Sequence, residues 1–143
     1  MKLSQILLEY QELNDNELQP IVRGSFQSVY PNAPVFFKRD EPNLTISTSK
    51  EKLNDPSSLF GMGGDDFYLA LNAYVYKDTA DVVVSAAWAG KYKGVTSVII
   101  KNVFSKLKQL APAATLTLIA DDDRSDGAWE RIASKIGVNF ESQ

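Results

Sequence analysis

Apolar and polar residues alternate strictly over residues 67–77, which is the clearest pattern in the chain. A period of two predicts a β-strand with one apolar face and one polar face. The apolar positions are Phe67, Leu69, Leu71, Ala73 and Val75, and the other face carries Tyr68, Ala70, Asn72, Tyr74 and Tyr76. After a turn at 77–80, the apolar run at 82–89 predicts a returning strand that is more deeply buried.

A helical period follows this hairpin over residues 95–110, and Pro112 ends it. Apolar residues at spacings of three and four predict an amphipathic helix with its charged side in solvent. The inward positions are Val95, Val98, Ile99, Val103, Leu107 and Leu110, and the outward ones are Lys101, Ser105 and Lys108.

Three further elements are predicted toward the C-terminus. Residues 115–120 form a strand, 126–135 a helix that Gly137 ends, and 138–141 a last strand. The inward side of this helix carries Ala128, Trp129, Ile132 and Ile136. The order hairpin, helix, strand, helix, strand predicts an α/β or α+β fold, a mixed and twisted β-sheet flanked by helices.

The first 66 residues carry weaker patterns. Residues 2–13 have the apolar spacing of a helix, and a second helix, capped by Asp15 or Asn16, is predicted to end before Pro31. Short strands are predicted at 35–38 and 44–48. The glycine-rich residues 54–66 lack both the preceding strand and the Lys-Ser/Thr pair of a phosphate loop, which favours a surface loop.

Size and charge limit the classes of function. The 143 residues and 15.8 kDa fit one domain over 1–143, and a net charge of -3 argues against nucleic-acid binding, which needs a basic face. No apolar run reaches the length of a membrane span, and the first residues lack the features of a signal peptide. We therefore expect a cytoplasmic protein without a membrane partner.

The chain has no Cys and no His, which restricts its chemistry. Disulfides, thiol nucleophiles, imidazole bases and most zinc sites are excluded. Acid–base steps would have to use Asp, Glu, Tyr, Lys, bound water or a terminus.

The stretch before the third predicted helix could hold a phosphate. The first N–H groups of a helix have no backbone partners and favour an anion, and Gly94 has no Cβ to keep a phosphate away. Thr96 and Ser97 add hydroxyl groups, and Lys91 and Lys93 add positive charge. The alternative is an ordinary helix start, with solvated lysines and a capping hydroxyl.

The order of elements over residues 82–141 resembles the second half of the GCN5-related N-acetyltransferases (the GNAT family). In that family a buried strand leads into an Arg/Gln-x-x-Gly-x-Gly/Ala loop that holds the pyrophosphate of acetyl-coenzyme A. Here the stretch Lys91-Tyr92-Lys93-Gly94-Val95-Thr96 corresponds to it and keeps only the middle glycine. Residues 123–140 resemble the closing pattern of the family, with Asp126 where the family has Asn.

The resemblance implies an acetyltransferase-like fold that binds acetyl-CoA and acts on a small amine or a protein amine. Residues 67–141 carry it, and 1–66 form a helical N-terminal part with short strands. The implied cofactor-binding residues are Ala87, Trp88, Lys91, Lys93, Gly94, Val95, Thr96, Ser97 and Asp126, with Trp88 expected in the core or in a cleft wall. No metal is implied.

One departure from the family concerns catalysis. Ala133 stands where the family commonly has the tyrosine that protonates the leaving thiolate, so turnover is expected to be weak or absent. The alternative function is a non-catalytic interaction or structural protein that kept the fold. Similar degenerate acetyltransferase-like proteins occur in tailed phages, some as virion components, which would place the chain in the host cytoplasm or the virion, as a homo-oligomer or beside a virion partner.

The polar face of the strand 67–77 offers replacements for the missing acid. Tyr74 and Tyr76 are the candidate catalytic residues, because a phenol with an ordinary pKa near 10 can donate a proton to a thiolate. The alternative is that this face packs under a helix. Candidate bases, acting through water, are Asp65, Asp66 and Asp81.

The acidic run 121–123 follows a predicted strand together with Asp126. Clustered carboxylates can hold Mg²⁺, and a solvated loop that starts the next helix is the alternative.

Overall fold

A single mixed sheet organises the chain in the computed structural model, which describes residues 10–54, 64–121 and 127–143. Six strands follow the order β2 (Phe36–Asp40), β3 (Asn43–Ser47), β4 (Tyr68–Tyr76), β5 (Thr79–Trp88), β6 (Thr115–Ala120) and β7 (Asn139–Ser142). A seventh strand, β1 (Tyr10–Glu12), pairs with β4. The described helices are α2 (Asp15–Val29), α3 (Lys50–Asn54), α4 (Val95–Leu110) and α5 (Ala128–Ile136). The predicted mixed sheet flanked by helices is confirmed.

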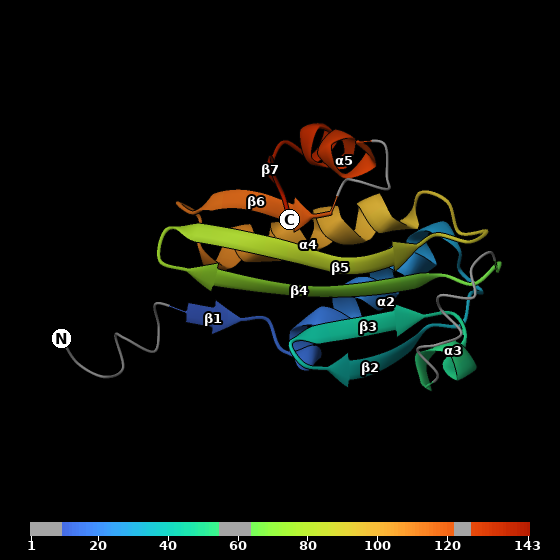
Figure 1. Cartoon of the computed structure of the whole chain (residues 1–143). Helices are drawn as coiled ribbons and strands as arrows, with labels where there is room; N and C mark the ends of the chain where they lie inside the picture. The colour runs from blue at the N-terminus through green and yellow to red at the C-terminus, as the bar shows by residue number, and fades with distance from the viewer. Residues whose placement is uncertain (1–9, 55–63, 122–126) are drawn as a thin grey trace.

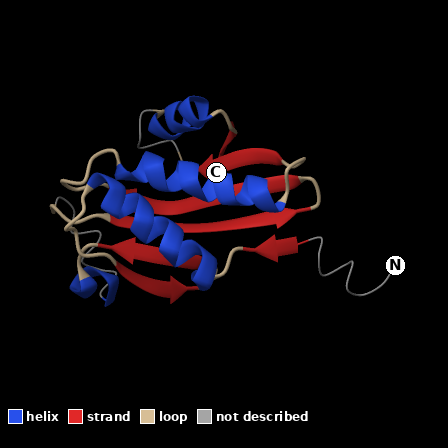
Figure 2. Cartoon of the chain, turned by 180° about the vertical axis from the view of Figure 1, so that it is seen from behind, coloured by secondary structure: helices blue, strands red, loops and turns tan. Residues whose placement is uncertain are grey.

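Antiparallel and parallel pairing meet at β5. The β4–β5 hairpin is antiparallel, whereas β5 with β6 and β6 with β7 are parallel pairs connected through α4 and α5. Figure 2 shows α2 and α4 side by side across one face of the sheet. The strands β4, β5 and β6 carry no described helix on the other face, which is turned toward the viewer in Figure 1.

The core lies between the sheet and these two helices. The alternation in β4 and β5 places Leu69, Leu71, Val82 and Val84 on the covered face, and all four are buried. The partners from the helices are also buried: Leu18, Val22, Phe26, Ile99, Ile100, Val103, Phe104 and Leu107. Ile100 and Phe104 therefore point inward, whereas Leu110, which the period placed inward, is 38% exposed at the last turn of α4.

The N-terminal prediction is wrong where it can be tested. Residues 10–12 form the strand β1 instead of the end of a helix over 2–13, and residues 1–9 lie outside the described parts of the chain. The reason is pairing: Glu12 lies opposite Tyr74, and the N–H of Leu13 donates to the carbonyl of Ala73 at 2.9 Å. Sheet pairing overrides local helical spacing here.

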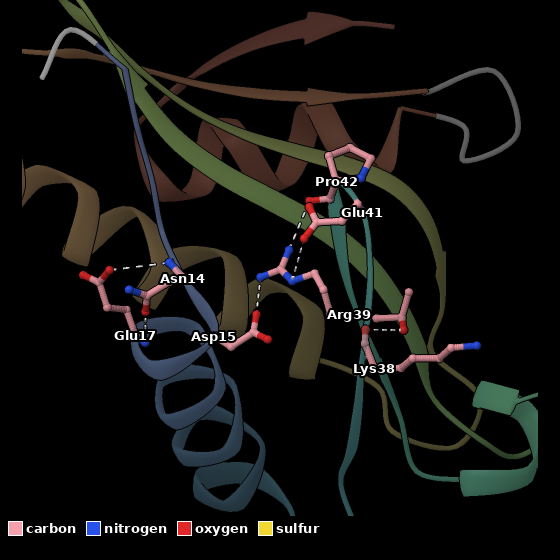
Figure 3. A network of polar contacts seen from close by, with 8 residues as sticks. Asn14, Asp15, Glu17, Lys38, Arg39, Glu41 and Pro42 are labelled. Atoms are coloured by element: carbon pink, nitrogen blue, oxygen red, sulfur yellow. Dashed lines mark hydrogen bonds and ion pairs between the residues drawn. The ribbon is translucent and has the colours of Figure 1, made fainter. Parts of the chain in front are cut away.

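The start of α2 lies one residue earlier than predicted. Asn14 is the N-cap, and its side-chain oxygen accepts from the N–H of Glu17 at 3.0 Å. Figure 3 shows this cap beside Arg39, which pairs with Asp15 and donates to the carbonyl of Pro42 at 3.1 Å. These contacts tie the start of α2 to the β2–β3 turn.

The strand β5 differs from its prediction in its second half. Ala80, Val82 and Val84 are buried, but the residues from Ser85 to Trp88 are exposed, so the strand is not the more deeply buried member of the hairpin. Pairing with β6 stops at Val84, opposite Ala120, and beyond that point no described strand pairs with this edge of β5. Leu71 lies opposite Val84 and Ala70 opposite Ala86, so Ser85 is the extra residue of a β-bulge.

The remaining elements agree closely with their predictions. The helix α4 has the predicted bounds, β6 and β7 follow, and Gly137 caps α5 with a φ of 90°. The short helix α3 was not predicted, and most of the predicted loop 54–66 lies outside the described residues. Among the described helices, none has the length and apolar character needed to cross a bilayer.

Candidate functional site

The helix α4 begins with amides that no side chain of the described residues caps. Its N-cap is Gly94, whose φ of 87° is in the left-handed region that favours glycine. A Cβ placed on Gly94 would meet no atom within 4 Å, so the space beside it is open. The hydroxyl of Ser97 donates to the carbonyl of Gly94 at 3.1 Å and does not cap an amide. The start of α4 therefore offers backbone donors to an anion.

The loop that leads into α4 is anchored in the core. Tyr92 is buried, and its ring packs edge-on against Phe26 and Tyr30 at centroid distances of 5.2 and 5.1 Å. The hydroxyl of Tyr30 donates to the carbonyl of Lys93 at 3.1 Å. Lys91 and Lys93, on either side of the buried ring, are exposed. Because the ring of Tyr92 is buried, the loop is fixed with the side chains of Lys91 and Lys93 in solvent, just before the start of α4.

A close backbone contact fixes the other end of this loop. Gly90 has a φ of 57°, and a Cβ there would lie 2.3 Å from the carbonyl oxygen of Asp65. The N–H of Lys91 donates to that same oxygen at 3.0 Å. Because only glycine allows this approach, Gly90 is required for the loop to lie against the backbone of Asp65.

Ala87 and Trp88 form the exposed end of β5 and directly precede this loop in the sequence. Trp88 is 44% exposed, and its indole N–H donates to the carbonyl of Gly64 at 3.0 Å. It is therefore not a core residue and lies on the surface, where it covers the backbone at residue 64. Ala87 is exposed as well.

The predicted catalytic tyrosines lie at the other end of the hairpin. Tyr74 lies opposite Asp81 and Tyr76 opposite Thr79, whereas Trp88 lies opposite Tyr68. Seven residues separate Asp81 from Trp88, which is roughly 20 Å along a strand. The described structure therefore does not bring Tyr74 or Tyr76 beside the start of α4.

Tyr74 and Asp81 form a polar pair on the helix-free face. Burial raises the pKa of Tyr74 above its usual value, and the hydrogen-bonded carboxylate of Asp81 raises it further. Burial also raises the pKa of Asp81, whereas the Tyr74 hydroxyl lowers it and Glu141 raises it. The phenol thus stays protonated at neutral pH and is a poorer acid than a tyrosine with an ordinary pKa. No helix of the described residues packs over it.

The three candidate bases have different surroundings. Asp66 accepts a hydrogen bond from the hydroxyl of Thr48 at 2.9 Å and pairs with Lys52 at 3.5 Å, so its carboxylate has structural partners. Asp65 is exposed beside the loop before α4, and Asp81 belongs to the tyrosine pair. Asp65 contacts the loop leading into α4 through its backbone carbonyl, which leaves its exposed carboxylate without a structural partner among the described residues.

The acidic run gives no metal site in the described residues. Asp122, Asp123 and Asp126 lie outside them, which leaves the placement of Asp126 untested, and Asp121 is exposed after β6. Within 10–54, 64–121 and 127–143, no three carboxylates gather as metal ligands would.

Ala133 is 1% exposed and belongs to the core, packed between α5 and the sheet. Its carbonyl accepts the N–H groups of Gly137 and Val138 at the helix end. The side chain of this position points away from solvent, so a phenol there would displace core atoms.

Sequence reasoning missed two features of this site. The burial of Tyr92 could have been predicted, because an aromatic residue between two lysines in a short loop indicates a ring that packs inward. The bulge at Ser85 could not, since small residues on both sides of it fit a regular strand equally well.

We found no match to this chain among protein-family models, curated proteins or solved structures.

Proposed function

We propose that this chain is a GNAT-like domain that binds acetyl-coenzyme A, with the pyrophosphate on the amides of Val95, Thr96 and Ser97. The observation that carries the proposal is the uncapped start of α4 behind Gly94, open to solvent and preceded by the exposed Lys91 and Lys93. A diphosphate satisfies free N–H groups and gains from the helix dipole and the two cations.

The fold supports the same location. In open sheets with parallel strands, ligands bind beyond the carboxyl ends of the strands. The strands β5 and β6 are such a pair, and α4 begins beyond the end of β5. Among the described residues no strand pairs with this edge of β5 from Ser85 to Trp88, and an extended ligand group would pair with the backbone there.

The acceptor would be a small amine or a protein amine, which attacks the thioester carbonyl directly. Holding the two reactants together is the main contribution that the fold can make. The amine must lose a proton, for which we propose Asp65, acting through a water molecule, because its carboxylate is exposed beside the loop before α4. With Ala133 buried and the tyrosines distant, we expect weak or no acetyl transfer.

A non-catalytic role is the second candidate, and two observations favour it. The candidate acids at Tyr74 and Tyr76 lie roughly 20 Å from the end of β5. Position 133 is a methyl group in the core. In this role the chain is an interaction protein of the cytoplasm or of a phage virion, with no turnover.

Calorimetric titration with acetyl-CoA tests the proposal. We expect heat of binding for the wild type and a large loss of affinity in Gly94→Val, whose side chain would occupy the phosphate position. Gly137→Val is the matched control, because Gly137 has nearly the same φ and equally open space. It lies at the C-terminal end of a different helix, α5. No heat with the wild type at millimolar ligand would refute coenzyme binding. Equal losses in both variants would show that backbone strain alone is responsible.

A further inference from the structure

Three tyrosines gather at the turn end of the sheet, away from the proposed coenzyme site. Tyr10 of β1 stacks on Tyr74 at a centroid distance of 5.4 Å and lies 6.2 Å from Tyr76 at an angle of 60°. Tyr10 is 48% exposed and Tyr76 43% exposed. Both rings are therefore partly accessible from solvent.

Carboxylates surround these rings. Glu12 lies directly opposite Tyr74 on β1, and Asp81 lies opposite it on β5. Glu141 on β7 raises the pKa values of both Tyr74 and Asp81, so its charge acts at the same place. Directly opposite residues share a face, so the rings and at least two carboxylates lie on the helix-free side.

These carboxylates have no cationic partner within the described residues. The ion pairs there join Arg39 to Asp15 and Glu41, and Lys52 to Asp66. In addition, Oε1 of Glu12 is buried and receives no hydrogen bond from any described group. A buried carboxylate oxygen without a donor is costly. The charge of Glu12 also raises the pKa of Tyr10 beside it, after the larger effect of burial, so Glu12 adds to the negative potential around the rings.

A cation of the chain itself already lies over one of these rings. The ammonium group of Lys77, at the β4–β5 turn, lies 5.2 Å from the centroid of the Tyr76 ring. A cation over an aromatic face is attracted by the ring quadrupole, and nearby carboxylates add to the attraction. The composition of the face therefore selects a cation.

The shape of the face selects an extended ligand. Small-molecule sites are concave and enclose most of their ligand. Here the groups lie across neighbouring strands on an open sheet face, from β1 through β4 to β5. Strand spacing makes that width about 10 Å, which suits several side chains of one peptide.

We propose that the tyrosine–carboxylate face, formed by Tyr10, Glu12, Tyr74, Tyr76, Asp81 and Glu141, docks an arginine- or lysine-containing segment of a protein partner. The guanidinium or ammonium groups lie over the exposed rings and pair with Asp81, and the charge of Glu12 adds to the attraction. This docking does not depend on the proposed coenzyme site, which lies at the opposite end of the hairpin.

The test uses a fluorescein-labelled peptide of seven residues in which three arginines alternate with glycines, titrated with the full chain. We expect saturable anisotropy that weakens with salt, and no binding of the same peptide with glutamates. Tyr10→Leu and Asp81→Asn should each weaken binding about two- to fivefold, the range expected for losing one cation–π or surface charge contact. Lys77→Gln, which removes the competing cation, should strengthen it.

The matched control is Glu51→Gln, which removes an exposed carboxylate from α3. If it weakens binding as much as Asp81→Asn does, the attraction is only that of an acidic protein, and the proposal is wrong. Absence of binding at low salt would also overturn it. Displacement by an equal concentration of arginine amide would assign a small-molecule site and overturn the docking of a segment. Circular dichroism of each variant separates lost binding from lost folding.

Discussion

The two ends of the β4–β5 hairpin use the same residue type in opposite ways. At the end that leads into α4, Tyr92 is 8% exposed and packs against Phe26 and Tyr30. At the turn end, Tyr10 and Tyr76 are 48% and 43% exposed. The helix layer makes the difference, because Tyr92 lies against α2, whereas the turn-end rings lie on the face without a described helix (Figure 1).

The charges at the two ends are also opposite. Lys91 and Lys93 are exposed beside uncapped helix amides, whereas Asp81, Glu12 and Glu141 act around the turn-end rings. An anion is favoured at the first end and a cation at the second. Two binding proposals can therefore be tested separately on one hairpin, with each end as a control for the other.

Truncation of the two kinds of tyrosine should give the largest contrast. Tyr92→Ala removes a buried ring from an aromatic cluster, and we expect a loss of about 3–5 kcal/mol in the free energy of unfolding. Tyr10→Ala removes a half-exposed ring and should stay within about 0.5–1 kcal/mol. Urea denaturation followed by circular dichroism measures both. Similar losses would mean that the turn-end rings are also a structural cluster.

A second contrast lies within the loop before α4. Gly90→Ala places a Cβ 2.3 Å from the carbonyl oxygen of Asp65 at a positive φ, so strain and overpacking add up. We expect a loss of about 2–4 kcal/mol in the free energy of unfolding. Gly94→Ala has the positive φ without the contact and should cost about 1 kcal/mol. Equal costs in urea denaturation would show that segment 64–66 moves aside and does not hold the loop.

Much of the fold was predictable because its second half has long, unambiguous periods. The strict alternation of β4 and the helical spacing of α4 gave their bounds almost residue by residue. Residues 10–12 were misassigned because three residues carry too little pattern to compete with the helical spacing before them. The exposure of Ser85–Trp88 was also missed, since it depends on where the neighbouring strand β6 ends, a property of another segment.

The candidate site was predictable only in part. Gly94 and its lysines could be identified, because a strand, a glycine and a helix are adjacent in sequence. Alternation gives the face on which Tyr74 and Tyr76 lie but leaves open their distance from the start of α4. The tyrosine–carboxylate face joins β1, β4, β5 and β7, and its assembly depends on pairing between segments that sequence periodicity does not specify.

A third contrast compares a buried and an exposed position of the helix α5. Ala133→Tyr inserts a phenol where the native methyl group is 1% exposed. We expect a loss of about 1–3 kcal/mol in the free energy of unfolding, from overpacking, and no gain in acetyl transfer. Ser134→Tyr, at an exposed neighbouring position, is the control for adding a ring to α5. A stable Ala133→Tyr variant with increased turnover would contradict the packing described for α5.

The smallest expected effect concerns the carboxyl group of Asp81 at the turn end. Burial raises its pKa above the usual value of 3.8, so the folded state keeps the proton to a higher pH than the unfolded state does. The folded protein then loses stability as the pH rises from the unfolded pKa through the raised folded pKa. The loss is complete once the pH exceeds the raised folded pKa.

Asp81→Asn removes this titration and keeps an oxygen that accepts the Tyr74 hydroxyl. We therefore expect the variant to match the wild type at low pH and to become slightly more stable than it as the pH rises to 7. The effect should be a fraction of a kcal/mol, because solvent screens a partly exposed group. Asp78→Asn, in the exposed turn, controls for the change in net charge, and urea midpoints from pH 3 to 7 give the comparison. A variant that instead becomes less stable toward pH 7 would mean that the Asp81 carboxylate has a cationic partner, which would also remove the basis for docking a basic segment on this face.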